Sequence, residues 1–217
     1  MGKITDEVYH ILRRRIMKGQ LPPNAKIKEL DVAAELGVSR TPVRSALQRL
    51  ITDGLLQQGR KRGAVTISWT DRDVSEIFEL RIALEGIGAA HAARNCRPEA
   101  LEELARLTDE MEFLWRVRPS DYFSRLQAAN SRFHRIVLDE SQCPRVRDIA
   151  LNLMDMPMVV SGFYLYSEPD MARSIQHHRD LIAAIAAGDV AWAETVMRNH
   201  LMASLRVFVN SKRNDVS

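Results

Sequence analysis

The apolar residues at the start of the chain recur every three or four positions, which is the spacing of one helical face. Three segments with this spacing are predicted helices: 5–18, 28–36 and 39–53. The period then shortens, and residues 55–58 and 64–67 are predicted to pair as strands across a basic turn. Three helices followed by a hairpin predict a winged helix-turn-helix domain in residues 1–68.

After a short hinge at residues 69–70, the helical spacing dominates the remaining sequence. Residues 71–217 are therefore predicted to form an antiparallel bundle. Its predicted helices are 71–95, 98–118, 120–141, 144–167, 169–187 and 189–211. Pro157 falls inside the fourth of these helices and is expected to kink it. The predicted fold class is mainly α, with an N-terminal winged helix-turn-helix domain followed by an all-α bundle.

The charge distribution separates the same two parts of the 217-residue chain, which carries a net charge of +3. Residues 1–68 hold 13 basic and 6 acidic side chains, whereas residues 69–217 hold 18 basic and 22 acidic ones. A basic module joined to a mildly acidic one predicts that the first part contacts a polyanion.

The composition also bounds where the protein works. No apolar run approaches the ~20 residues of a membrane helix, and the N-terminal sequence lacks the pattern of a secretory signal. Cys96 and Cys143 are too few for a disulfide framework. We therefore expect a cytoplasmic protein with reduced thiols and no membrane partner.

The third predicted helix has the residues of a DNA-reading helix in its first turns. Arg40, Arg44 and Gln48 follow at intervals of one turn and share a stripe. The planar fork of arginine matches guanine, and each good contact discriminates by ~1–3 kcal/mol. The residues predicted to contact DNA are Ser39, Arg40, Thr41, Arg44 and Gln48 on the helix, and Arg60, Lys61 and Arg62 on the turn of the hairpin. The alternative is an ordinary solvated basic surface.

Polar side chains interrupt the apolar stripes of the bundle. In the stretch NSRFH, Asn130 and His134 lie one turn apart in the middle of such a stripe, and His178 and His200 do the same on two other helices. A polar group buried without a partner costs roughly 1–3 kcal/mol, so these four side chains need partners inside the bundle. Two interpretations stay open: neutral core histidines with hydrogen bonds, or a transition-metal site of three imidazoles and an oxygen donor.

A second inward polar pair lies in the segment FELRIALE. Arg81 and Glu85 are one turn apart among apolar residues. They predict either a structural ion pair or an arginine that binds the carboxylate of a small effector. Ser161, Tyr164 and Tyr166 are expected to line the same cavity.

The motifs resemble those of a known family. Residues 4–68, with GQLPPNAKI and LGVSRTPVRSALQRLITDGLL, resemble the DNA-binding domain of GntR-type bacterial transcription regulators. Residues 71–211, with DVSEIFELRIALEGIGAAHAA, NSRFH, HHRDLIAAIAAGD and MRNHL, resemble the FCD domain of the FadR-like branch. The resemblance implies a regulator, expected to be a repressor, that binds a pseudo-palindromic double-stranded DNA operator as a homodimer.

The resemblance also implies a ligand set and an effector class. The implied metal ligands are Asn130, His134, His178 and His200, with Asn130 standing where relatives carry an acid. The metal is expected to be a divalent transition ion, with zinc first and nickel, manganese or iron as alternatives. It would help to bind a small organic acid that modulates operator binding.

Two rival functions remain to be separated from a regulator. One is a metalloenzyme that acts on a small organic acid and carries an accessory DNA-binding domain. Such an enzyme needs a general base beside metal-bound water, and Glu85 is the inward acid in the sequence. The other is a purely structural helical dimerisation domain without a ligand.

Overall fold

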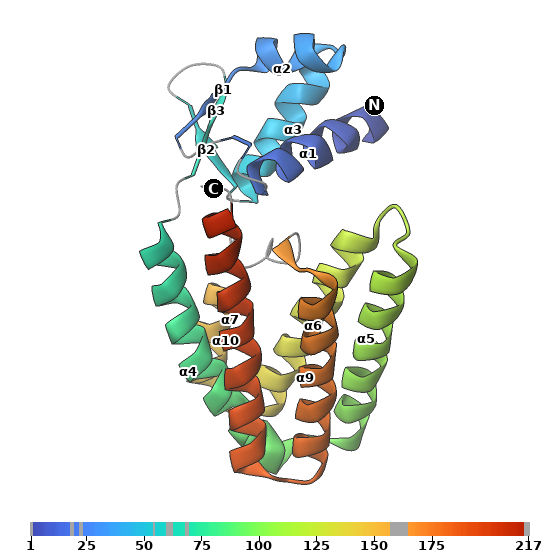
Figure 1. Ribbon diagram of the computed structural model, residues 1–217, viewed down its shortest axis with the longest axis vertical. Helices are drawn as coiled ribbons and strands as arrows, with labels where there is room; N and C mark the ends of the chain where they lie inside the picture. Colours follow the sequence, from blue (N-terminus) through green and yellow to red (C-terminus); the bar gives the residue numbers. More distant parts are fainter. Residues whose placement is uncertain are drawn as a thin grey trace. The chain divides into compact units, whose positions relative to one another are not determined.

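The chain forms two compact units, Met1–Thr70 and Asp71–Ser217. The computed structural model describes residues 2–17, 20–21, 24–53, 55–59, 63–67, 70–156 and 165–214 (Figure 1). The elements of the first unit are α1 (Gly2–Met17), β1 (Lys26–Ile27), α2 (Glu29–Leu36), α3 (Arg40–Thr52), β2 (Leu56–Gln58) and β3 (Ala64–Thr66).

The core of the first unit forms where α1 and α3 pack against each other. Val43 and Leu50 of α3 are completely buried, and Val8 and Leu12 of α1 lie in the same cluster. The apolar stripes that predicted these helices are therefore the faces that meet. This packing leaves the opposite face of α3 in solvent.

The sheet has one strand more than the predicted hairpin. Its order is β1-β3-β2, and both pairings are antiparallel. β1 is only two residues long, which is too short to give an alternating pattern in the sequence. Gly63 adopts a φ of 141°, and a Cβ atom there would lie 2.4 Å from the Ile27 carbonyl oxygen. A glycine is therefore needed where the end of the turn passes β1.

The second unit is an antiparallel helical bundle (Figure 1). Its described helices are α4 (Asp71–Asn95), α5 (Pro98–Val117), α6 (Tyr122–Glu140), α7 (Pro144–Met154), α9 (Glu168–Ala186) and α10 (Val190–Asn214). α4 packs along α10, α5 along α6, and α9 along α10. The mainly α fold class, with a winged helix-turn-helix domain before a helical bundle, is confirmed.

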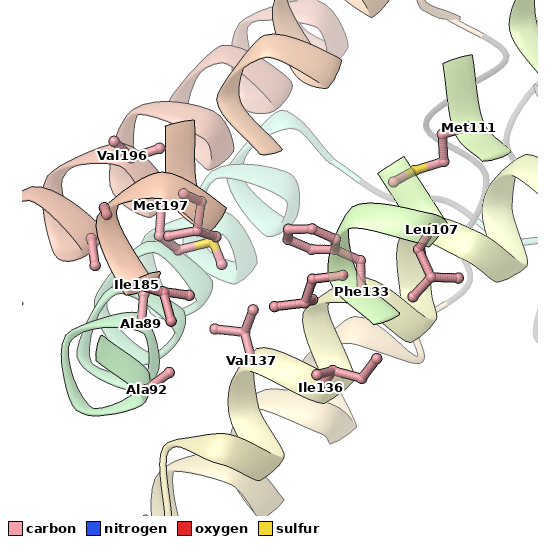
Figure 2. Close-up of a cluster of buried hydrophobic side chains, with 14 of the residues drawn as sticks. Ala89, Ala92, Leu107, Met111, Phe133, Ile136, Val137, Ile185, Val196 and Met197 are labelled. Carbon is pink, nitrogen blue, oxygen red and sulfur yellow. The ribbon is translucent and has the colours of Figure 1, made fainter. Parts of the chain in front are cut away.

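The bundle encloses one large apolar cluster (Figure 2). Ala89 and Ala92 of α4 are completely buried, and their small side chains let the larger Val196 and Met197 of α10 fill the space. Phe133 of α6 is also completely buried in this cluster. His134, the next residue along α6, is therefore also held inside the bundle.

The fourth helix of the bundle is shorter than predicted. The sequence predicted 144–167, but α7 ends at Met154 and Asp155 caps it. The residue before a proline avoids helical geometry, so a helix usually ends ahead of it, and Pro157 lies close downstream. Pro157 itself, where a kink was predicted, lies outside the described residues. α9 then begins with a capping box in which Ser167 and Asp170 exchange hydrogen bonds.

The helices do not have the character of membrane spans. Within the described part of the chain, none combines the length and the apolar content needed to cross a bilayer.

Candidate functional site

The first turns of α3 present a polar surface. All five side chains of α3 and its N-cap that were predicted to contact DNA are exposed: Ser39, Arg40, Thr41, Arg44 and Gln48. Ser39 stands at the N-cap in an extended conformation and its side chain makes no capping hydrogen bond, so the first amides of the helix have no acceptor within the helix. Such a helix N-terminus suits a phosphate. Arg60, Lys61 and Arg62 lie outside the described residues.

One glutamate holds both arginines of this surface. Glu29, at the start of α2, has a side chain that is only 7% exposed. It accepts hydrogen bonds from Arg44 Nε at 3.0 Å and Nη2 at 2.9 Å, and from Arg40 Nη2 at 3.1 Å. The hydrogen bonds from Arg44, followed by those from Arg40, lower the pKa of Glu29 to about 2, although burial opposes the shift. Glu29 is therefore a charged anchor at any ordinary pH.

Glu29 leaves part of each arginine side chain available to other partners. The side chains of Arg40 and Arg44 remain 44% and 58% exposed. Glu29 uses the Nε–Nη2 edge of Arg44, so the Nη1–Nη2 edge can still reach a guanine. Glu29 is not among the residues predicted from the sequence, because an acid at the start of a short helix also serves as an ordinary N-terminal residue.

Three histidines from three helices converge in the bundle. His134 of α6, His178 of α9 and His200 of α10 are 1%, 1% and 5% exposed. One ring nitrogen of each lies within 4.8 Å of those of the other two. The ring centroids of His178 and His200 are 4.6 Å apart, and those of His134 and His200 are 5.1 Å apart. The structure therefore brings the three predicted imidazole ligands together.

A buried carboxylate orients the first of these histidines. Glu85 of α4, which is completely buried, lies with Oε2 2.7 Å from His134 Nδ1 and Oε1 2.7 Å from Arg81 Nε. Burial alone would raise the pKa of Glu85, but Arg81 and His134 outweigh it and lower the pKa to about 2. Because an ionised carboxylate only accepts, His134 Nδ1 is the donor of this hydrogen bond. A carboxylate behind a histidine is the usual outer support of a metal ligand.

Several polar atoms around these histidines have no hydrogen-bond partner among the described residues. They are Asn130 Oδ1, both ring nitrogens of His178, His200 Nδ1 and His177 Nδ1. Burial, reinforced by the neighbouring histidines, lowers the pKa of His178 and of His200 well below its usual value, so both rings are neutral. Neutral imidazoles with unused lone pairs are metal ligands. The donor set therefore fits a transition metal better than it fits a satisfied core.

The side chains predicted for the effector are only partly described. Arg81 is 4% exposed and carries its charge close enough to disfavour protonation of His200. The hydroxyl of Tyr166 donates to Ser204 Oγ at 2.7 Å. Ser161 and Tyr164 lie outside the described residues.

A narrow pocket reaches His200 between α9 and α10. It has a volume of about 10 Å³, which is room for roughly one water molecule. Its lining residues are Tyr166, Asp170, Arg173, Ser174, His177, His200, Ala203, Ser204 and Val207. Arg173 is 56% exposed, and its Nη1 lies 3.9 Å from Asp170 Oδ1. The pocket thus extends from the half-exposed Arg173 to His200 at the edge of the histidine cluster.

Family models cover most of the chain. Residues 4–65 match the model described as bacterial regulatory proteins of the gntR family. Residues 76–203 match the FCD domain. The two matches fall within the two compact units.

Known relatives match over most of their length. The chain is 28% identical to a probable D-xylose utilization operon transcriptional repressor of Paenarthrobacter nicotinovorans, over 96% of the chain and 90% of the relative. It is 30% identical to the gluconate operon transcriptional repressor of Bacillus licheniformis, over 82% and 74%. The structure of Escherichia coli McbR/YncC is similar in fold, with a TM-score of 0.63, 23% identity and coverage of 97% and 99%.

Proposed function

The chain belongs to the gntR family of bacterial regulatory proteins and carries an FCD domain, and on that premise we propose that it is an effector-controlled transcriptional repressor. Residues 1–68 bind operator DNA, residues 69–70 act as a hinge, and residues 71–217 bind the effector and dimerise. Two of the relatives named above bear the names of a gluconate operon repressor and a probable D-xylose utilization operon repressor, which supports repression over activation.

The observation that carries the DNA-binding role is the exposed face of α3. Its arginines are held in place by Glu29 while half of each side chain stays in solvent. Side chains fixed in this way lose less conformational entropy when they bind a base. Arg40, Arg44 and Gln48 contact base edges, Ser39 and Thr41 contact phosphate, and the basic turn 60–62 adds contacts to the backbone.

The operator test uses DNA selected by the protein from a random pool. Fluorescence anisotropy should show tighter binding to the selected site than to a scrambled site of equal length, and binding should weaken steeply with salt as counterions are released. Equal affinity for the two fragments would contradict a sequence-specific regulator. A flat salt dependence would contradict the phosphate contacts.

The second part of the proposal is a metal in the bundle. FCD domains commonly hold one, and here His134, His178 and His200 would be the ligands with Asn130 as the oxygen donor. We propose zinc first, with nickel, manganese and iron as alternatives that the same donors accept. When bound, the metal supplies a Lewis acid that attracts a carboxylate.

The metal assignment can be tested by removing two ligands. The variant His134→Ala with His178→Ala should lose bound metal in elemental analysis after dialysis. His91→Ala is the matched control, because His91 lies on α4 outside the cluster. A double variant that keeps its full metal content would overturn the site.

The proposed effector is a small carboxylate metabolite that Arg81, Tyr166 and the undescribed Ser161 and Tyr164 help to bind. Tyr166 lines the pocket between α9 and α10, which admits about one water molecule, so binding of an organic acid there would require that pocket to widen. A thermal-shift screen of organic acids, with and without divalent metals, would identify the class. No shift with any acid would favour a purely structural bundle.

Dimerisation is proposed because one recognition helix reads only half of a pseudo-palindromic operator. Leu80 and Ile87 are 53% and 41% exposed and lie two turns apart on α4, where a second copy of the chain would cover them. We place the dimer in the bacterial cytoplasm. Sedimentation of the purified protein would test the assembly.

The metalloenzyme alternative is not supported. A hydrolytic site needs a free general base, whereas Glu85 is already engaged by Arg81 and His134. The relatives described above are also named as regulators of transcription rather than as enzymes.

A further inference from the structure

The first unit exposes a large apolar side chain at the start of α2. Leu30 is 64% exposed, more than any other large hydrophobic residue that the structure describes. The inner face of α2 is made by Glu29, Val32 and Ala33, which are buried. Leu30 follows Glu29 by one residue, so it is turned from it by about 100° around the helix and points out of the core. A single exposed leucine is ordinary on a protein surface, so its surroundings decide whether it has a role.

The surroundings of Leu30 belong to the surface proposed to bind DNA. Glu29, the preceding residue, accepts hydrogen bonds from Arg40 Nη2 at 3.1 Å and from Arg44 Nη2 at 2.9 Å. Neighbouring Cα atoms are about 3.8 Å apart, so these bonds bring Leu30 to the edge of the arginine pair. In a helix-turn-helix domain the first helix crosses the DNA backbone where the second enters the major groove. α2 is that first helix, and Leu30 lies in its first turn, the turn that contacts Arg44.

The chemistry of a leucine limits what it can recognise on DNA. It carries no charge and no hydrogen-bonding group, so it gains nothing from a phosphate or from a polar base edge. The charged residues on either side, Lys28 and Asp31, pair with each other at 3.7 Å. The apolar group that DNA presents in the major groove is the C5-methyl group of thymine. A leucine at the edge of the groove therefore favours thymine over the other bases.

We infer that Leu30 is a specificity-determining residue, because its side chain covers the C5-methyl group of a thymine near the base that Arg44 contacts. The inference rests on the proposed DNA-binding function and adds an apolar contact to the polar ones. Glu29 links the two contacts, since its carboxylate fixes Arg44 and its backbone continues into Leu30. The operator half-site should therefore hold a thymine close to the guanine that Arg44 contacts.

Replacement of thymine by uracil tests the inference, because the two bases differ only in this methyl group. The DNA is the operator fragment that the protein selects from a random pool. Each thymine is replaced in turn, in both half-sites together, with the opposite adenine kept. Fluorescence anisotropy should find a position at which uracil weakens binding of the wild-type protein by about fourfold per half-site. If no thymine shows such a loss, the inference is overturned.

The variant Leu30→Ala shows whether the methyl contact belongs to this residue. At the sensitive position it should bind the thymine and uracil fragments equally. Its unfolding temperature should match that of the wild type, because Leu30 lies outside the buried core of the first unit. Leu30→Ser also removes the apolar contact and gives the same comparison in an independent variant. Variants that keep the fourfold ratio would overturn the assignment.

The matched control is Ile4→Ala, which also removes an exposed apolar side chain from the first unit. Ile4 is 48% exposed and lies two residues before Asp6, which pairs with Arg49 in the last turn of α3 rather than with the first turn. This variant should keep the wild-type ratio between thymine and uracil. The ratio should also stay constant as salt is raised, although both affinities fall, because a methyl contact releases no counterion. Loss of the ratio in the control would count against a local contact by Leu30.

The outcomes separate this inference from the proposed function. Specific operator binding that does not depend on Leu30 would leave the proposed function intact and overturn the inference. The exposed leucine would then be available to a protein partner instead. Equal affinity for the selected and the scrambled fragment would refute both.

Discussion

Glu29 in the first unit and Glu85 in the second are both buried carboxylates that hold two basic side chains, yet they place those side chains differently. Glu29 binds Arg40 and Arg44, which remain about half exposed. Glu85 binds Arg81 and His134, which are 4% and 1% exposed. One buried glutamate therefore positions Arg40 and Arg44 for a partner outside the protein. The other positions Arg81 and His134 for a ligand inside it.

The difference in exposure also decides how much each ion pair contributes to stability. A pair with an exposed member gains little from its charge, because water screens it. A buried network cannot lose one member without leaving another charge unpaired in the interior. Glu29 is therefore expected to tune DNA binding, whereas Glu85 is expected to sustain the fold of the bundle as well as its site.

The largest effect is expected from breaking the buried network. Glu85→Gln leaves Arg81 without its counter-charge and should lower the free energy of unfolding by about 3–5 kcal/mol in urea denaturation. Glu76→Gln is the matched control, since Glu76 pairs with Arg72 on the same helix but both are exposed. That control should change stability by no more than about 0.5 kcal/mol. Equal effects of the two substitutions would mean that burial does not set the contribution of these ion pairs to stability.

The next effect concerns the exposed pair. Arg44→Ala should cost about 1–3 kcal/mol of discrimination between the operator and a site altered at one guanine, with the fold unchanged. Arg49→Ala is the control on the same helix, because Arg49 is engaged by Asp6 and the ring of Tyr9 instead. The measurement is anisotropy on matched DNA fragments. Unchanged specificity in the Arg44 variant would refute the recognition surface.

The stability of the metal-free protein should depend on pH because of its buried histidines. Burial lowers the pKa of His178 and His200 in the folded state, whereas in the unfolded chain each titrates near 6.5. As the pH falls below about 6.5, these two histidines bind protons in the unfolded chain but not in the folded chain. Stability should then fall by roughly 1 kcal/mol per pH unit for each histidine.

Urea denaturation at pH 8 and pH 5.5 would measure this slope. The variant His178→Asn with His200→Asn lacks both titrating groups, so its stability should change less between the two pH values. An equal change in the variant would mean that other groups carry the dependence.

The smallest effect is expected from Glu29→Gln. The amide keeps the shape of the side chain but loses its charge, so the anchor of Arg40 and Arg44 weakens and operator affinity should fall by about 1 kcal/mol. Glu35→Gln is the control, because Glu35 lies on the same helix and pairs with Arg15. Tighter DNA binding by the Glu29 variant would mean that Glu29 competes with DNA rather than positions the arginines.

The sequence predicted the elements whose signals are local. α4 runs from Asp71 to Asn95, the span that the apolar spacing predicted, and the burial of Val43 and Leu50 follows the stripe of α3. The end of α7 was missed because the period continued past Met154 while Pro157 opposed a helix. β1 was missed because two residues carry no period.

The candidate sites also divide into features that local sequence patterns predicted and features that they did not. The inward direction of His134, His178 and His200 followed from helical spacing alone. Their mutual distances and the contact of His134 with Glu85 join residues from different helices, which no local pattern specifies. Glu29 could have been suspected only by knowing that the start of α2 lies beside Arg44.

The origin of the three histidines on α6, α9 and α10 has a consequence for how the bundle opens. A metal held by all three would act as a cross-link between segments distant in sequence, much as a disulfide does. Any fluctuation that separates α9 from α6 would then have to break a metal–ligand bond first. Filling the site would join α6, α9 and α10 into one cooperative unit, and amide hydrogen exchange along α9 would slow accordingly.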